Sequence, residues 1–485
     1  MKKRTLYGLF LILAVFVTSC ELPDNMDPKN AKIVSPNALF TQAEISLFNQ
    51  VAELDYNLNC SRFLAQYLSE VTYTTETRYN FSDRQVSDNF SGILYRDVLM
   101  NLKDCKEKVL AKALTPSYTE GIQKNQVAIT NLLEIYTYHV LVDQFGNVPY
   151  SEAVMGAENS RPKYDDALTI YQDLITRLNT VITNLDDTYT GFGDADILYD
   201  DDIALWKKFA ASLKLRIALR LSDVPQVNAG TLVSEAVATG VFTDQAESAI
   251  LRFYGIAPYV NPYYQAFVLD ARKDFCPTNT LVDILNNLSD PRRAVWFTEY
   301  PEGSGNYLGL PYGKSGSSSY SKFSHLTDDI RINPQYPAVI LDYVEVEFLL
   351  AEAAARNLGG VTGAETHYNN AILASMAYWG VSDADAETYL DRSDVAYPTA
   401  TGTYKQKIGT QKWLALFDRG VEGWAEWRRL DFPILNVPER MTYADIPVRM
   451  PYPFNENKMN KVNYEDASAA IGGDKMSTKL FWDKF

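Results

Sequence analysis

Apolar residues recur at the three- and four-residue spacing of an α-helix over most of the segments 120–222 and 342–430. Between Ile129 and Val140 this spacing places the apolar side chains on one face of a helix that ends near Gly146. A chain with this pattern buries its core between helices, so we predict a mostly α fold. The same spacing continues in two further segments, 167–185 and 205–222.

The second helical part begins with two helices joined at a glycine. Asp342 and Glu345 have the spacing of a capping box, and the pattern stops at Gly359. In the helix that follows, Ala and Tyr positions are spaced as in the second helix of a tetratricopeptide repeat (TPR), although ordinary packing of alanine-rich helices gives the same pattern. We therefore predict a TPR-like helical scaffold. A last helix is predicted over 411–429, with four residues on its buried face: Leu414, Phe417, Val421 and Trp424.

Between these parts, residues of about 242–340 lack the helical pattern and are rich in proline, glycine and serine. Aromatic residues are frequent in this segment, and loops of this kind cannot place all of them in a regular helix face. We predict a large irregular region that carries the ligand surface. The rings predicted to stack on a ligand are Trp296, Tyr259, Tyr263, Tyr300 and Tyr307.

Two alternatives stay open for these five rings. Each can instead fill the core beneath a long loop, and Trp296 follows the basic pair Arg292 and Arg293, over which it can pack. If the five rings are core, the aromatic residues of 56–97 are the next candidates for the ligand surface.

The first 19 residues have the features of a secretory signal peptide. A basic start precedes a 12-residue apolar run from Leu6 to Val17, which is too short for a transmembrane helix. The run ends in Val17-Thr18-Ser19-Cys20, which resembles the bacterial lipobox, so Cys20 is predicted to be lipidated. We predict a signal peptide over 1–19, a lipidated tether over 20–37 and a single domain over 38–485.

The net charge of −16 disfavours nucleic acid as a partner, because an acidic surface repels phosphates. The three histidines are far apart and none has a second ligand at metal-binding spacing, so no metal site and no cofactor are predicted. The cysteines that follow Cys20 permit either one disulfide or three buried thiols. They are Cys60, Cys105 and Cys276.

No arrangement of residues typical of an enzyme is present. The chain lacks the nucleophile elbow, the HExxH zinc motif and the dinucleotide-binding glycines. A pair of carboxylates for glycoside hydrolysis could come from Glu345, Glu347 and Glu352, but these lie on or beside a packed helix, where ion pairing explains them better. We predict that the protein is not an enzyme.

The assembled segments resemble the SusD/RagB family of nutrient-binding outer-membrane lipoproteins, and within it the SusD-like branch. The likeness rests on the lipobox and on a series of segments in the same order along the chain. They are VDQFGNVPYSEA (142–153), YDDALTIYQDLI (164–175), LWKKFAASLKLRIALRLS (205–222), YVEVEFLLAEAAARN (343–357), YNNAILASMAYWGV (368–381), QKWLALFDRGVEGWAEWRRLDFP (411–433) and RMPYPFNENKMNKVNY (449–464).

This resemblance implies a function as well as a fold. It implies a lipid-anchored protein on the outer face of the outer membrane, which binds nutrient oligosaccharides and delivers them to a SusC-like TonB-dependent transporter. Two alternatives are an oligopeptide ligand in the same transport system and a structural lid that binds no nutrient. The segments are mainly scaffold, so the resemblance indicates fold and role better than ligand.

Overall fold

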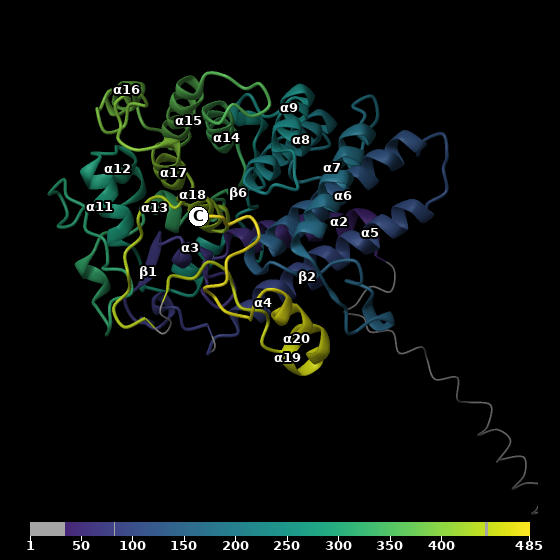
Figure 1. Ribbon diagram of the computed structural model, residues 1–485, viewed down its shortest axis with the longest axis horizontal. Helices are drawn as coiled ribbons and strands as arrows, with labels where there is room; N and C mark the ends of the chain where they lie inside the picture. The colour runs from purple at the N-terminus through teal and green to yellow at the C-terminus, as the bar shows by residue number, and fades with distance from the viewer. Residues whose placement is uncertain (1–33, 82, 442–444) are drawn as a thin grey trace, which may run out of the picture. The chain divides into compact units, whose positions relative to one another are not determined.

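The predicted helical segments form helices in the computed structural model, which describes residues 34–81, 83–441 and 445–485 (Figure 1). The predicted signal peptide, the predicted lipidation site at Cys20 and most of the predicted tether lie outside the described residues. The residues from Pro36 to Phe485 form one compact unit. Among the described residues, none of the helices is both long enough and apolar enough to cross a bilayer.

Helices make up most of this unit, which confirms the mostly α fold. The longer helices are α2 (Pro36–Ala52), α4 (Val86–Ile93), α5 (Met100–Ala111), α6 (Glu120–Phe145), α7 (Ala167–Asn184), α8 (Ile203–Arg220), α9 (Ala229–Thr239), α11 (Asn279–Asn287), α14 (Tyr343–Ala355), α15 (Ala364–Tyr378), α16 (Asp383–Leu390), α17 (Tyr404–Ala415), α18 (Gly420–Leu430) and α20 (Lys461–Ala470). The shorter ones are α3 (Ser61–Leu64), α10 (Pro262–Tyr264), α12 (Arg292–Trp296), α13 (Asp328–Arg331) and α19 (Glu456–Met459).

The strands of the described residues are short and pair two by two in antiparallel fashion. Strand β1 (Leu68–Glu70) pairs with β5 (Phe275–Pro277), β2 (Val148–Pro149) with β3 (Tyr164–Asp165), and β4 (Ala249–Leu251) with β6 (Ala338–Leu341). The β1–β5 pair brings residues 68–70 beside residues 275–277, which are distant in the sequence.

Polar side chains at the helix starts explain where several helices begin. The side chains of Asp166, Asp202 and Asp342 accept hydrogen bonds from the free backbone N–H groups in the first turns of α7, α8 and α14. Helix α6 ends at Phe145, as predicted, and Gly146 follows with a φ of 83°, a conformation that favours glycine.

Helices α14 and α15 pack against each other as the TPR-like pattern predicts. Tyr368, Ala371 and Ile372 of α15 are buried in one cluster with Val344 and Phe348 of α14. The small alanine lets the two helices approach closely, which supports the predicted repeat-like pairing.

The predicted single helix over 411–429 is wrong, because the segment forms two helices with a turn between them. Helix α17 ends at Ala415 and α18 starts at Gly420. In the turn, Arg62 donates a hydrogen bond to the Asp418 carbonyl, and a side chain at Gly420 would collide with Arg62, because its Cβ would lie 2.5 Å from the Arg62 backbone nitrogen. The four residues predicted for the buried face are buried nonetheless.

A network of buried charges joins the two helical parts. Arg216 of α8 donates two hydrogen bonds to Glu345 of α14, both of 2.7 Å. Arg220, one turn later, pairs with Asp143 of α6 and with Glu422 and Glu426 of α18. The predicted capping box is therefore only half formed: Asp342 caps the helix, while the Glu345 carboxylate turns inward to Arg216.

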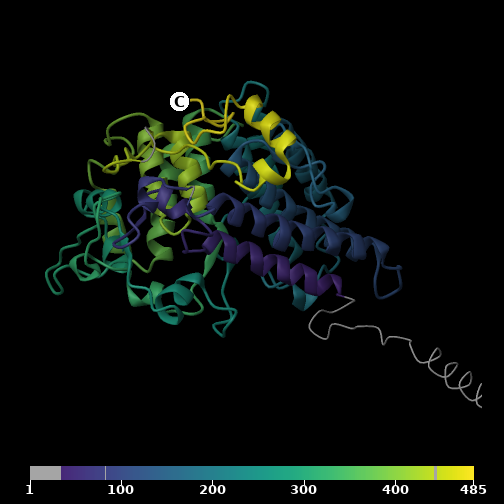
Figure 2. The same cartoon turned by 90° about the horizontal axis from the view of Figure 1, so that it is seen from below.

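The middle segment, 242–340, consists of short helices and strands joined by long loops, as the proline and glycine content predicts. Figure 1 shows α11 and α12 at the left end of the unit, with α6 and α7 toward its right end. In both views the C-terminal helices α19 and α20 lie beside the region of α4, where the backbone N–H groups of Phe454 and Asn455 donate to Asp88 (Figure 2).

Candidate functional site

Two of the five predicted stacking residues belong to the core, so their prediction as ligand contacts is wrong. The Trp296 side chain is 0% exposed, and its ring stacks on Phe417 with centroids 4.5 Å apart. Tyr263 is 1% exposed, and its hydroxyl donates to the Asp418 carboxylate at 2.5 Å. The two rings belong to the short helices α10 and α12, and both pack against the turn between α17 and α18. The local sequence pattern does not predict where this turn lies.

The other three predicted rings reach the surface but do not form one cluster. Tyr259 is 43% exposed and borders a cavity of about 310 Å³ together with Asp194 and Asp200. Tyr300 is half-buried and lines a different cavity of about 600 Å³. Tyr307 is half-buried, and the Arg293 guanidinium lies 5.5 Å from its ring centroid.

The cavity at Tyr300, which we call the loop cavity, lies between two extended segments that are hydrogen bonded to each other. Phe297 and Leu326 form an antiparallel bridge, and the Thr298 N–H donates to the His325 carbonyl at 2.8 Å. These bonds fix the base of the cavity although the surrounding chain is loop. The lining residues are Thr298, Glu299, Tyr300, Pro301, Glu302, Ser321, Phe323, His325, Thr327, Asp328 and Arg331.

The loop cavity combines aromatic rings with charged groups. The His325 ring stacks on Tyr320 with centroids 3.8 Å apart and planes 9° apart, and burial lowers the pKa of His325. Arg331 pairs with Asp328 at 2.7 Å, and both side chains are partly exposed at 34% and 64%. Aromatic faces next to carboxylate and guanidinium groups suit a ligand with apolar C–H faces and hydroxyl edges.

A further exposed ring, Tyr73, lies on a segment that is hydrogen bonded to the loop region, and the sequence prediction of five residues missed it. It is 46% exposed, and the guanidinium carbons of Arg84 and Arg272 lie 5.3 and 5.9 Å from its ring centroid. Tyr73 lies within 56–97, the segment that the sequence leaves as the second choice.

Hydrogen bonding connects the Tyr73 segment to the loop cavity. The Ser318 N–H donates to the Val71 carbonyl at 2.8 Å, and Val71 packs in a small core cluster against which Tyr320 and Phe323 rest. We call Tyr73, Arg84, Arg272 and the lining of the loop cavity the loop face. A sequence pattern could not join these parts, because nearly 250 positions separate Val71 from Ser318.

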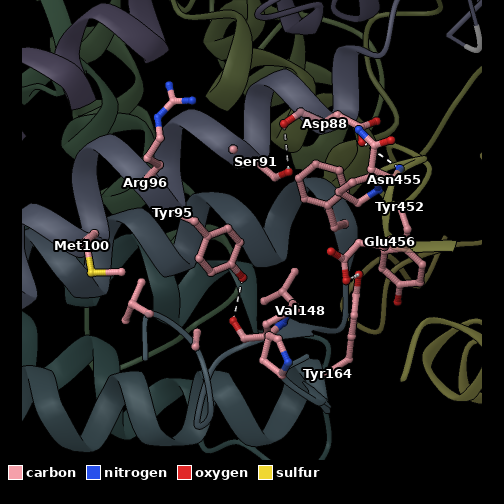
Figure 3. A pocket seen from close by; sticks show the side chains of 17 residues that line it. Asp88, Ser91, Tyr95, Arg96, Met100, Val148, Tyr164, Tyr452, Asn455 and Glu456 are labelled. Atoms are coloured by element: carbon pink, nitrogen blue, oxygen red, sulfur yellow. Dashed lines mark hydrogen bonds between the residues drawn. The ribbon is translucent and has the colours of Figure 1, made fainter. Parts of the chain in front are cut away.

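A third cavity, of about 480 Å³, lies between α4, the β2–β3 loop and the start of α19, and we call it the helix cavity (Figure 3). Its walls are mainly apolar and aromatic, and several of its polar groups already have protein partners, although the Tyr452 hydroxyl has none within the described residues. The Tyr95 hydroxyl donates to the Pro149 carbonyl at 2.6 Å, and the Tyr164 hydroxyl donates to Glu456 at 3.1 Å. The Asp88 carboxylate accepts two backbone N–H groups at 2.8 Å each. Such a wall suits an apolar group better than a sugar with a hydroxyl on most carbons.

One buried group among the described residues has the side chains for a metal ion: His139, Asp143 and Glu422. Arg220 occupies the space between the two carboxylates, donating to Asp143 at 3.0 Å and to Glu422 at 2.6 Å. Because this guanidinium already supplies the positive charge there, the group does not fit a metal cation.

The remaining candidates also have structural roles. Glu345 and Glu352 are fully buried and pair with Arg216 and Arg429, and Glu347 pairs with His367 at 2.7 Å. The three cysteines of the described chain are buried free thiols, so of the two alternatives the structure shows thiols and no disulfide; they are Cys60, Cys105 and Cys276.

Comparison with known proteins matches residues 28–453 to the SusD-like family described as "Starch-binding associating with outer membrane". Among solved structures, a chitin-binding protein shares 25% identity with a TM-score of 0.80, covering 93% of this chain and all of that one. A chitin-binding SusD homolog from Flavobacterium johnsoniae shares 23% identity with a TM-score of 0.76, covering 93% of this chain and 97% of that one. A SusD homolog from Bacteroides uniformis shares 23% identity with a TM-score of 0.77, covering 92% and 99%.

No curated protein sequence matches this chain. The family match nevertheless spans most of the chain, and the solved structures share its fold over more than nine tenths of its length. The protein therefore belongs to the SusD-like family, whose members associate with the outer membrane and are binding proteins rather than enzymes.

Proposed function

We propose that this protein binds glycans at its loop face and delivers them to a SusC-like TonB-dependent transporter of the outer membrane. The observation that carries the proposal is the loop cavity, in which the half-buried Tyr300 ring lies beside the paired charges of Arg331 and Asp328. Sugar rings place apolar C–H faces on aromatic rings, and their hydroxyl edges bond to carboxylate and guanidinium groups.

Similar proteins support a glycan as the ligand. The family is described as starch-binding, and two similar solved structures are named as chitin-binding. Starch and chitin differ in linkage and substituents, but both present pyranose rings with apolar faces. We infer a soluble oligosaccharide as the ligand class.

The test is calorimetric titration of the mature protein with malto-oligosaccharides, chito-oligosaccharides and oligopeptides. One of the two glycan series should bind. Tyr300→Ala and Tyr73→Ala should each weaken that binding about tenfold, since a nucleic-acid base stacked on an aromatic ring contributes roughly 1–3 kcal/mol and a sugar face should contribute no more.

Tyr259→Ala is the matched control, because Tyr259 is a partly exposed tyrosine that lines a different cavity. Loss of binding in the Tyr259 variant but not in the Tyr300 and Tyr73 variants would place the ligand at the Tyr259 cavity. The same titration of Tyr307→Ala tests whether the ring of Tyr307, another of the five predicted residues, contacts the ligand.

The same titration separates the two alternative functions. An oligopeptide ligand would be indicated by peptide binding alone, and the apolar helix cavity is the feature that favours it, since it can hold an apolar side chain. A structural lid of the transporter would bind neither class of ligand.

The anchor and the transporter partner are further parts of the proposal. The lipobox supports lipidation at Cys20, so the mature wild-type protein should carry acyl chains by mass spectrometry, and Cys20→Ala should release it from outer membranes. Protease treatment of intact cells tests whether the protein faces outward.

Purification from mild detergent should recover a large TonB-dependent barrel protein together with this protein. Repeated recovery of the lipoprotein alone would contradict the partnership.

A further inference from the structure

Two buried carboxyl groups lie beneath the Tyr73 part of the loop face. Glu70 ends strand β1, and Glu76 begins the short 3-10 helix Glu76–Arg78. Their side chains are 0% and 3% exposed. A pair of acids this deeply buried requires compensating partners.

Each of the two carboxyl groups has a partner for one oxygen only. Arg272 donates to Glu70 Oε1 at 2.7 Å, and Arg84 lies 2.9 Å from Glu76 Oε1. The other oxygens, Glu70 Oε2 and Glu76 Oε2, are buried and have no hydrogen-bond donor within the described part of the chain.

The two carboxyl groups interact directly with each other. Burial raises the pKa of Glu70 well above the range of an ordinary glutamate, and the neighbouring Glu76 and Asp274 raise it further. Burial raises the pKa of Glu76 as well. Two ionised carboxylates in contact are unfavourable in a buried site, whereas one proton between them turns two unpartnered acceptors into a hydrogen bond.

We propose that Glu70 and Glu76 share a single proton between their Oε2 atoms, and that the protonated pair positions Arg272 and Arg84 close to the Tyr73 ring. Glu70 and Glu76 are positioning residues in this arrangement, because they act on the ligand only through the two arginines and the tyrosine. The effect on ligand binding rests on the function proposed above, while the shared proton itself does not.

The surrounding charges balance when one proton is present. Arg272 also pairs with Asp274 at 2.6 Å, and Arg84 faces Glu76. The negative charges of Glu76 and Asp274 then balance the positive charges of the two guanidinium groups, and Glu70 is neutral. The other titratable groups that face the pair are Asp55, Tyr56 and Cys60, and Tyr56 donates its hydroxyl to the Glu76 carbonyl at 3.1 Å.

The protonation of Glu70 in the folded protein determines how its stability changes with pH. In the unfolded chain Glu70 is ionised above about pH 4.3, whereas the folded protein retains the proton. Folding therefore takes up one proton, so the stability contributed by this pair is greatest at low pH and declines as pH rises toward the folded pKa. Loss of the proton places a second negative charge beside Glu76 and separates the carboxylates, which releases the guanidinium groups from the Tyr73 ring.

The first experiment compares the wild type with Glu70→Gln, whose amide reproduces the protonated carboxyl: the oxygen accepts from Arg272 and the nitrogen donates to Glu76. The unfolding equilibrium constant of each protein is measured in urea from pH 5.5 to 8. With one proton taken up on folding, the ratio of the wild-type to the variant constant should rise tenfold per pH unit. A ratio that does not change with pH would overturn the shared proton.

A bound cation between the two carboxylates would also leave that ratio unchanged with pH, but would make stability sensitive to EDTA, and this result overturns the proposal too. Glu107→Gln is the matched control, since Glu107 is 61% exposed and its pair with Lys103 is 3.7 Å long. It should show no such pH dependence.

The second experiment measures affinity for the oligosaccharide series that binds, at pH 7, where the folded protein retains the shared proton. The wild type and Glu70→Gln should bind alike, because the amide reproduces the protonated carboxyl. Glu70→Ala leaves Glu76 and Arg272 without their partner and should bind at least tenfold more weakly.

Equal affinities of the wild type and Glu70→Ala would show that the pair does not position the ligand surface. If no oligosaccharide binds at any pH, the proposed function fails, and the unfolding experiment still decides the shared proton.

Discussion

The charge network around α18 and the loop face place buried carboxylates in opposite situations. In the scaffold, the carboxylates of Glu422 and Glu426 are surrounded by arginines of α8 and α18, and every one of these acids has a basic partner. At the loop face, Glu70 and Glu76 have an unpartnered oxygen each and contact one another. The same residue type is thus paired in one region and left with surplus negative charge in the other.

This difference shows in the direction of the pKa shifts. Burial acts to raise the pKa of Glu422 and Glu426, but Arg216 and Arg220 near Glu422, and Arg429 and Lys412 near Glu426, outweigh it and lower both values. At Glu70 burial prevails over Arg272 and the pKa is raised. Complementary charges therefore hold the scaffold together, while the loop face retains a group that can change its protonation state.

Removing one member of the scaffold network should have the largest effect. Glu426→Ala leaves Arg220 and Arg429 without a shared carboxylate in a fully buried site, and we expect a loss of about 3–5 kcal/mol in the free energy of unfolding. Urea denaturation measures it. Glu120→Ala, which removes an exposed pair with Lys124 at 2.8 Å, should have a far smaller effect, because solvent screens the two charges. Similar losses for the two variants would contradict a stabilising network.

Alanine variants of Trp296 and Tyr300 distinguish a core ring from a ring of the ligand surface within the same loop region. Trp296→Ala removes a ring stacked on Phe417 and should lower the free energy of unfolding by about 3–5 kcal/mol. Tyr300→Ala should lower it by less than about 1 kcal/mol, because its ring is only half-buried. Denaturation of both variants checks the contrast, which fails if Tyr300→Ala is as destabilising as Trp296→Ala.

Acid should weaken the scaffold through His139. The Tyr171 hydroxyl donates to Asp143 at 2.6 Å, so His139 Nδ1–H is the donor in its 2.8 Å bond to Tyr171 and Nε2 is unprotonated. Burial lowers the pKa of His139 to about 4, aided by Arg220 and Arg216. The unfolded chain therefore binds a proton near pH 6.5 that the folded protein binds only near pH 4.

Stability should thus fall as pH decreases from about 6.5 to about 4, by an amount on the order of 1–3 kcal/mol, and the His139 contribution should level off below pH 4. The measurement is the free energy of unfolding of the wild type minus that of His139→Asn across this range. A difference that stays constant with pH would contradict a neutral buried His139.

Filling the helix cavity should have the smallest effect and should distinguish it from the loop cavity. A side chain at Gly92 of α4 meets open space, and Gly92 lines the helix cavity. Gly92→Leu should change the free energy of unfolding by only about 0.5–1 kcal/mol, toward stability, because glycine is unfavourable inside a helix. Oligosaccharide affinity should equal that of the wild type by calorimetry, whereas binding that disappears would place the ligand in the helix cavity.

The sequence alone determines most of the scaffold, because helices depend on local spacing and local caps. The apolar spacing around Ile129 predicts where a helix runs, and Asp342 predicts where α14 begins. Each of these signals lies within a few residues of the hydrogen bonds that form the helix. The resemblance to the SusD-like family follows from these same scaffold segments, and the family match confirms it.

Tertiary structure alone decides which rings and carboxylates are available for function. Trp296 is core because Phe417, more than a hundred positions away, covers its ring. Tyr73 belongs to the loop face because the chain brings residue 318 to residue 71 and Arg272 to Glu70. Burial and charge pairing are properties of neighbours in space, and for these residues the neighbours come from distant loops whose paths no local periodicity fixes.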